Sequence, residues 1–420
     1  MQISAQRHRS KFPWSKPICL SLLATLWMQS GHALQLDEAL DEAAASYPSV
    51  QARRGDVRSQ EAELKGANWQ RFPNLTMIGS TDAYGNPYTM ARVEQPLWMW
   101  GRLDANVDDA QARLDLSQAD LATTRLEVMV KTATAYAEVL RAKARADVAS
   151  QNAAEHERLF RMIERRVQGE VTATSDATLA SARLQQSVAE RIQFDNQVSN
   201  ASVTLSQLLG RRIAAAELSR PPLRPLGFSS LEDALEAASA YAPAIRRAEA
   251  QAISAQATLA ARRANNLPQL VARVDRQFGA QGIPKQTSYL ALQYQPGAGL
   301  SGYSGVVSGE AKVDSARASV EVARVELSDR VRNDWNDASA LQAQLGPLKA
   351  LVASTQDIKE SYLRQYTVGR KTWLEVLNAQ REAAQALYAV ADTQSSLLLA
   401  NTRLHLYTGY KGLQDPDKKD

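Results

Sequence analysis

The sequence predicts a mainly α-helical protein with a few β-strands, built from two structural repeats that each run helix, two strands, long helix, helix. Three observations support this fold class: an internal duplication, heptad spacing sustained far beyond the length of a globular helix, and four short segments with alternating side chains. Together they predict a long helical rod that ends in a sheet.

The first 33 residues have the composition of a secretory signal peptide. Basic residues at 7, 9, 11 and 16 precede the apolar stretch 18–28, which is too short to cross a bilayer as a helix. Small residues at 31 and 33 suit a signal peptidase, so we expect cleavage after Ala33. The alternative is a short membrane anchor. The single cysteine, Cys19, lies in this leader, so we expect neither disulfides nor a lipid anchor in the mature chain.

The mature chain is close to neutral. The full sequence has a formal net charge of +4 from 49 basic and 45 acidic residues, and removing the four basic residues of the leader leaves 45 of each. This balance gives no argument for a nucleic acid partner. No mature segment reaches about 18 consecutive apolar residues, so we expect no transmembrane helix.

The duplication has a constant register. Leu36, Ala39, Leu40, Pro48 and Pro73 recur 195 residues later as Leu231, Ala234, Leu235, Pro243 and Pro268. Further on, Gln95-Pro96 matches Gln295-Pro296 and Gly169 matches Gly369. The predicted organisation is a signal peptide at 1–33, a first repeat at 34–210, a linker at 211–230, a second repeat at 231–410 and a loose tail at 411–420.

Helix lengths predict a rod. From Gly101 onward, apolar and small residues step by four and three, as in the seam of a coiled coil. The segment 101–167 has 67 residues, which corresponds to about 100 Å of helix. The segments 36–70 and 176–209 are each about half as long, and Pro48 interrupts the first. Two half-length helices placed end to end therefore match one long helix.

The four expected strands cover about 74–84, 88–95, 270–278 and 287–295, with Pro96 ending the second. Arg273, Asp275 and Gln277 fall on one side of the third strand, with Ala272, Val274 and Phe278 on the other, where Arg276 breaks the pattern. These are lengths of tilted transmembrane strands, but four strands are too few to close a barrel. Several chains would have to share one barrel. The alternative is a periplasmic coiled-coil protein with two surface hairpins.

Three segments carry a resemblance to the TolC family: VEQPLWMWGRLDANVDDAQ (93–111), RVQGEVTATSDATLASARL (166–184) and YTVGRKTWLEVLNAQ (366–380). The chain resembles this family over essentially its whole mature length. The resemblance implies a homotrimer with a shared 12-stranded β-barrel in the cell outer membrane, in contact with its lipid, and an α-helical coiled-coil tunnel through the periplasm. It also implies docking on a periplasmic adaptor (membrane fusion protein) and an inner-membrane pump.

Site residues follow from the same resemblance. Glu375 and Asn378 occupy the positions of the periplasmic gate, with Asp176 as a further contributor; the amide at 378 departs from the family's second carboxylate. The adaptor-docking tips would be Val167, Gly169, Val368, Gly369, Arg370 and Thr372, and both glycines suit turns with positive φ. Tyr84, Tyr88, Trp98 and Trp100 would be interfacial aromatics. The alternatives are a solvated helix face for the gate and ordinary packing for the tryptophans.

Catalytic chemistry is not expected. The mature chain has two histidines, His156 and His405, far apart, and no nucleophile–base constellation or phosphate-binding loop, so we expect no enzyme, cofactor or metal. The expected function is a passive exit duct that passes a protein substrate of a type I secretion system from an inner-membrane ABC transporter and adaptor. The missing lipidated cysteine, the short loop 85–87 and the modest length favour that branch. A small-molecule or multidrug efflux duct and a non-channel scaffold are the alternatives.

Overall fold

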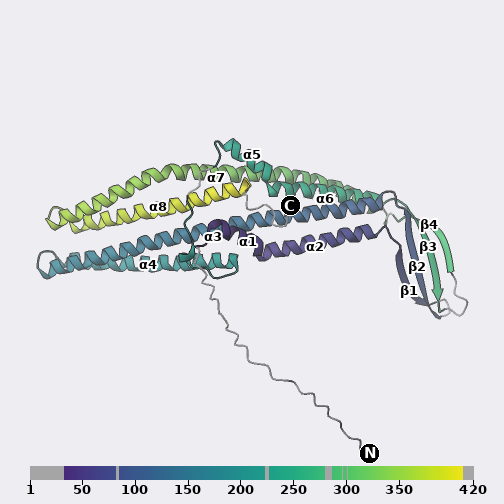
Figure 1. Ribbon diagram of the computed structural model, residues 1–420, viewed down its shortest axis with the longest axis horizontal. Helices are drawn as coiled ribbons and strands as arrows, with labels where there is room; N and C mark the ends of the chain where they lie inside the picture. Colours follow the sequence, from purple (N-terminus) through teal and green to yellow (C-terminus); the bar gives the residue numbers. More distant parts are fainter. Residues whose placement is uncertain are drawn as a thin grey trace, which may run out of the picture.

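The protein is an elongated helical rod with a small sheet at one end, as seen in a computed structural model that describes residues 33–81, 85–222, 227–279, 286–295, 297–299 and 301–409 (Figure 1). The proposed leader up to residue 32, Tyr84 and the tail 411–420 lie outside the described residues. Among the helices in these ranges, none is long and apolar enough to cross a membrane.

The two halves have the same order of elements. The first half comprises α1 (Leu36–Ser46), α2 (Pro48–Trp69), β1 (Asn74–Thr81), β2 (Pro87–Trp98), α3 (Arg102–Gln168) and α4 (Thr174–Leu209). The second comprises α5 (Leu231–Tyr241), α6 (Pro243–Asn265), β3 (Gln269–Phe278), β4 (Gln286–Gln293), α7 (Ser301–Thr367) and α8 (Trp373–Tyr407), after the short 3-10 helix η1 (Ala215–Glu217). Helices α3 and α7 both have 67 residues, which confirms the duplicated helix–strands–helix fold class.

Prolines set the helix breaks. Pro48 and Pro243 each occupy the first turn of a helix, α2 and α6, where the missing backbone N–H is not needed. The chain before each proline leaves the helical conformation, so α1 and α5 end there. As a result α2 and α4 lie along successive parts of α3, and α6 and α8 along successive parts of α7 (Figure 1). Helix α7 continues through Pro347 as one bowed helix.

The largest core lies midway along the rod, where α1, α3, α4 and α8 meet. Tyr136 of α3 is fully buried there, and its hydroxyl lies 2.8 Å from the carbonyl oxygen of Leu34 and 2.6 Å from that of Ser219. Leu34 also forms a parallel bridge with Leu218. The start of the first repeat and the linker between the repeats are therefore attached to the same side chain of α3.

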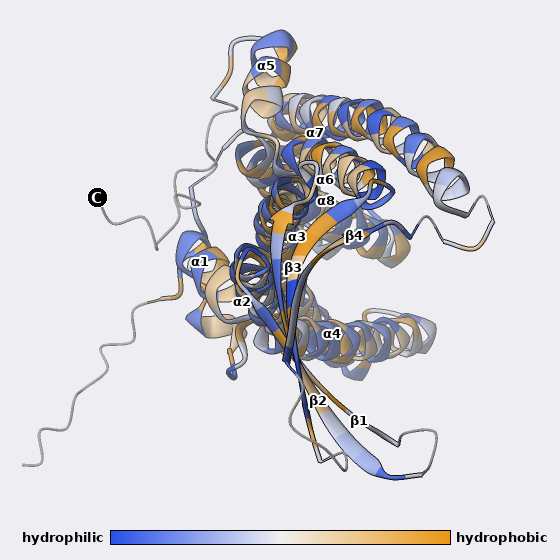
Figure 2. Ribbon diagram, turned by 90° about the vertical axis from the view of Figure 1, so that its right-hand side faces the viewer, coloured by the Kyte–Doolittle hydropathy of each residue, from blue (hydrophilic) through white to orange (hydrophobic). Residues whose placement is uncertain are grey.

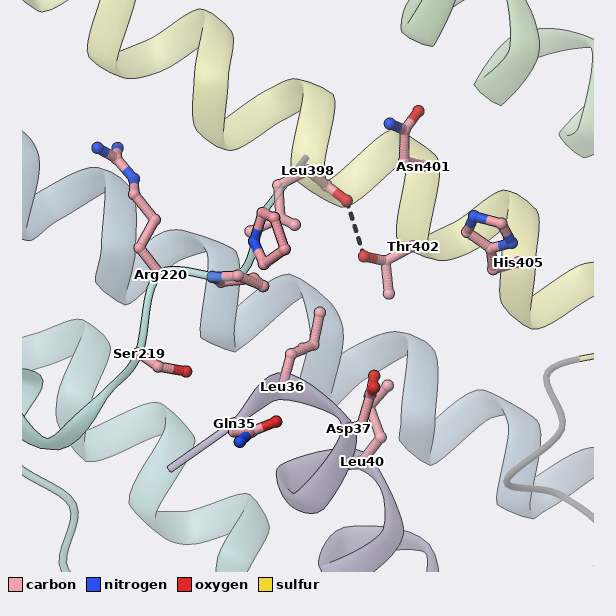
Figure 3. A pocket seen from close by; sticks show the side chains of 12 residues that line it. Gln35, Leu36, Asp37, Leu40, Ser219, Arg220, Leu398, Asn401, Thr402 and His405 are labelled. Atoms are coloured by element: carbon pink, nitrogen blue, oxygen red, sulfur yellow. Dashed lines mark hydrogen bonds between the residues drawn. The ribbon is translucent and has the colours of Figure 1, made fainter. Parts of the chain in front are cut away.

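A cavity of about 400 Å³ opens beside this attachment (Figure 3). Leu36 and Asp37 of α1 line one side, and Thr402 and His405 of α8 line another. Linker residues 219–222 complete the wall. The cavity thus marks the place where the linker crosses the two helices.

The four strands form one antiparallel sheet in the order β1-β2-β3-β4. The expectation that Pro96 ends the second strand is wrong, because β2 continues to Trp98, which pairs with Leu270 of β3. The register shifts between Pro96 and Trp98. A bulge explains the difference, since it accommodates a proline that cannot donate to the ladder.

Candidate functional site

One face of the sheet is polar and internally paired. Arg92 Nε lies 2.8 Å from Asp275 Oδ1, and Arg273 Nε lies 2.6 Å from Glu94 Oε2, so two ion pairs join β2 to β3. The hydroxyl of Tyr289 on β4 donates to Asp275 over 3.1 Å. The network therefore spans three strands and fixes their register with charge-assisted hydrogen bonds.

The opposite face is apolar and exposed. It carries Leu75 and Met77 of β1, Val93 of β2, Val274 of β3, and Leu290 and Leu292 of β4. The sheet projects beyond the helices, and orange apolar positions alternate with blue polar ones along its strands (Figure 2). Strands β1 and β4 are open edges of the sheet within this chain. A single chain thus presents a two-faced sheet with both edges unpaired. Strands of other chains could pair with these edges, and an apolar environment could cover the apolar face.

Aromatic side chains collect where the sheet meets the helices. Trp98 and Trp100 pack edge to face with ring centroids 5.9 Å apart, and both are more than half exposed. This exposure excludes core packing for them within one chain. Tyr88 lies near the other end of β2, opposite Ser80. Trp69 and Phe72, whose exposed rings lie 5.1 Å apart just before β1, were not predicted, although their place before Pro73 was a visible signal.

The opposite end of the rod holds both helix turns (Figure 1). Tyr366 of α7 joins them: its hydroxyl is 3.2 Å from Thr172 Oγ1 in the first turn, and its ring is 5.4 Å from that of Trp373 in α8. The guanidinium of Arg166 also lies over the Tyr366 ring, 5.2 Å from its centroid. A small apolar core, which includes Leu159, fills the space between the helices. We call this region the tip.

The two turns are equivalent, but in a register that differs from the expected one. Gly369 has φ 75°, as expected, whereas Gly169 has φ −87° and Glu170 takes the left-handed conformation with φ 57°. The closing backbone hydrogen bonds are Val171 N to Arg166 O and Glu170 N to Val167 O in the first turn, and Arg370 N to Gln365 O and Gly369 N to Tyr366 O in the second. Glu170 therefore corresponds to Gly369, and the pairing of the two glycines was wrong by one residue.

This register predicts opposite effects for two substitutions in the turns. Glu170→Gly removes the cost of a left-handed non-glycine residue and should stabilise the tip by about 0.5–1 kcal/mol. Gly369→Ala should destabilise it by about 1–2 kcal/mol, although no neighbouring atom would contact the added methyl group. Amide exchange in both turns is the measurement. Gly169→Ala is the control, and a loss of protection there larger than in Gly369→Ala would contradict this register.

Glu375 has a local role that was not predicted from the sequence. Its carboxylate accepts the Thr372 amide over 2.9 Å, while Thr372 Oγ1 accepts the Glu375 amide, which forms a capping box at the start of α8. Lys371 Nζ is 2.7 Å from the same carboxylate. The Thr-x-x-Glu spacing was a sufficient signal for this cap. The hydrogen bond from Lys371, followed by those from Thr372, lowers the pKa of Glu375 from 4.5 to about 2.

This cap predicts a pH dependence confined to strongly acidic solution. Because the folded pKa is depressed, the contribution of Glu375 is fully present above pH 4.5 and disappears as pH falls from 4.5 towards 2. We expect protection factors for amides at the start of α8, corrected for intrinsic exchange, to stay constant down to about pH 5 and to fall below it. Glu375→Gln retains the capping geometry and should show no such dependence. An equal fall in that variant would contradict the assignment.

The other two proposed gate residues lie in different surroundings. Asp176 accepts a 2.8 Å hydrogen bond from Thr172 Oγ1, so it belongs to the contact that joins the turns. Asn378 instead lines a polar cavity of about 180 Å³ between α3, α4 and α8, together with His156 and Glu190. The structure thus does not bring the three residues into one cluster within a single chain.

Burial lowers the pKa of His156, the histidine that lines this cavity. Within the described ranges, no three histidine, cysteine or acidic side chains come together as a metal site.

Comparisons with known proteins agree with this geometry. The family model "Outer membrane efflux protein" matches residues 39–211. Two curated proteins named "Pyoverdine export outer membrane protein OpmQ" are each 26% identical: that of Pseudomonas putida over 74% of this chain and 67% of its own length, and that of Pseudomonas aeruginosa over 92% and 86%.

Solved structures share the fold. The outer membrane protein VceC of Vibrio cholerae superposes with a TM-score of 0.75 at 18% identity, covering 89% of this chain and 96% of its own. The outer-membrane channel OprN gives a TM-score of 0.78 at 18% identity, covering 89% of each chain. These findings confirm the expectation of an outer-membrane transport protein rather than an enzyme. The chain is thus similar to outer membrane efflux proteins over its first repeat, and it shares the fold of the two solved structures over 89% of its length.

Proposed function

We propose that the chain is the outer-membrane exit duct of a tripartite export pump and works as a homotrimer. The observation that carries this proposal is the sheet, with one ion-paired polar face, one exposed apolar face and two open edges. Three copies of its four strands would give 12, enough to close a barrel around a water-filled lumen. The polar face would line the lumen and the apolar face would meet lipid.

The rod would then form the periplasmic tunnel, and the tip its inner end. The turns, with Val167, Gly169, Val368, Gly369, Arg370 and Thr372, would dock a periplasmic adaptor that connects to an inner-membrane pump. Glu375, Asn378 and Asp176 would surround the entrance. The contact of Tyr366 with Thr172 and Trp373 supports a tip held closed in the isolated chain. Opening would move α7 and α8 away from the first turn.

For the cargo we propose a small molecule rather than a protein. The support is that two relatives, from Pseudomonas putida and Pseudomonas aeruginosa, carry the name of pyoverdine export. The names of these relatives refer to pyoverdine export and not to protein secretion. The inner-membrane pump could still be an ABC transporter, since the architecture of the duct does not depend on the cargo.

The proposal is tested by deleting the gene and measuring both classes of cargo. We expect small metabolites to accumulate in the periplasm and to disappear from the medium, while the pattern of secreted proteins stays unchanged. Complementation with the intact gene should restore export. If small-molecule export stayed unchanged and an exported protein were trapped in the cell, the proposed cargo would be contradicted. That result would support a type I secretion duct instead.

A further inference from the structure

Arg276 stands apart from the other arginines of the sheet. Arg92 and Arg273 each face a carboxylate across the strands, on the polar face. Arg276 lies on the apolar face, opposite Ala91 of β2 and Gln286 of β4. Among the residues that the structure describes on that face, it is the one charged side chain, and it is exposed with no ion pair.

Its position along the strand is close to the hairpin end. Arg276 follows Leu270, the partner of Trp98 near the helices, by six residues, or about 20 Å of strand. A lipid-facing band is about 25 Å tall, so Arg276 would lie in its outer half. Because β3 is an inner strand of the sheet, its outward face would stay uncovered when β1 and β4 pair with other copies.

The side chain points further outward. The guanidinium carbon of Arg276 lies 5.1 Å from the ring centroid of Phe278, two residues closer to the hairpin end. This cation–π contact aims the charge towards the level of the headgroups, as long basic side chains at membrane interfaces do. Gln286 and Ser288 of β4 and Thr89 of β2 occupy the same face at that end and add hydrogen-bond donors.

We propose that Arg276, with Gln286 and Ser288, binds the phosphate of an anionic lipid in the outer leaflet of the outer membrane. The inference rests on the proposed duct, in which this face meets lipid. An arginine without a carboxylate is costly in the middle of an apolar band and tolerated near its edge, where a phosphate can accept two guanidinium N–H groups. In this site a lipid phosphate takes the place of the carboxylates that pair with Arg92 and Arg273 on the polar face.

The test is native mass spectrometry of the full-length protein in detergent, titrated with diphosphorylated lipid A. We expect Arg276→Gln to weaken lipid A binding by about tenfold, the usual effect of losing one charge-assisted contact, and Arg276→Lys to weaken it less. Lipid A without phosphates should bind wild type and Arg276→Gln equally. The matched control, Arg92→Gln combined with Asp275→Asn, removes a paired arginine from the polar face and should bind lipid A like wild type.

Equal lipid A binding by wild type and Arg276→Gln would overturn the inference. It would also be overturned if wild type bound phosphate-free lipid A as tightly as diphosphorylated lipid A. Displacement of lipid A by millimolar inorganic phosphate would assign the site to a free anion and also overturn it. The same spectra count chains. A wild-type particle without three chains would contradict the duct, whereas three-chain particles with unchanged lipid binding would contradict only the role of Arg276.

Discussion

Trp373→Ala is expected to release the tip, with the largest effect on the proposed gate of any single substitution. The Trp373 side chain is 3% exposed and packs against Tyr366, inside the small core that holds α8 to α3 and α7. Truncating a buried aromatic residue of this size costs about 3–5 kcal/mol. Amide protection at the start of α8 should therefore fall by about 100-fold or more. Single-channel conductance in planar bilayers should rise.

Two variants serve as controls for this prediction. Leu374→Ala removes the neighbouring side chain, which is 52% exposed, and should leave protection and conductance unchanged. Trp373→Phe should retain most of the packing, and the indole N–H it removes has no hydrogen-bond partner to lose. Unchanged conductance in Trp373→Ala, despite a loss of protection, would show that this core does not hold the entrance closed.

Tyr136→Ala should lower the free energy of unfolding by about 3–5 kcal/mol, because it empties a fully buried site in the central core. Tyr136→Phe isolates the hydroxyl. In Tyr136→Phe the carbonyl of Leu34 still accepts a hydrogen bond from the Ser219 amide at 3.1 Å. The Ser219 carbonyl, in contrast, loses the hydrogen bond that the Tyr136 hydroxyl donates to it. One buried acceptor left without its donor costs about 1–3 kcal/mol.

Guanidinium unfolding in detergent, followed by tryptophan fluorescence, gives both values. Proteolysis in the linker separates the contribution of the Tyr136 hydroxyl from that of the ring. Tyr136→Phe, which removes only the hydroxyl, should already increase cleavage near Ser219. If Tyr136→Phe and wild type are cleaved equally, the hydroxyl does not attach the linker to α3. Unfolding of Tyr136→Ala at the wild-type denaturant concentration would contradict the central core as described.

Much of the fold could be predicted from the sequence because its main determinants are periodic or repeated. The heptad spacing after Gly101 gave α3 nearly to the residue, and Pro48 and Pro243 gave the breaks between the shorter helices. Alternation in 272–278 gave the two faces of β3, including the misfit of Arg276. These features depend on neighbours within a few positions along the chain.

Other features depend on groups that the sequence does not bring together. The attachment of Leu34 and Ser219 to Tyr136 joins residues 102 and 83 positions apart, and no local pattern announces it. The left-handed residue of the first turn was assigned to Gly169 because glycine favours that conformation, yet the hydrogen bonds that end α3 place it at Glu170. The capping role of Glu375 was visible in the Thr-x-x-Glu spacing, but the residue was interpreted only through the family resemblance, as part of the gate.

In the proposed duct, the sheet of one chain is a third of a shared barrel in the outer membrane. Its most direct test is the native mass of the species extracted with detergent from the outer-membrane fraction. Three chains per particle, recovered from that fraction, is the predicted result. A soluble monomer or dimer would contradict it, because the open edges of β1 and β4 would then pair with no other copy in the membrane.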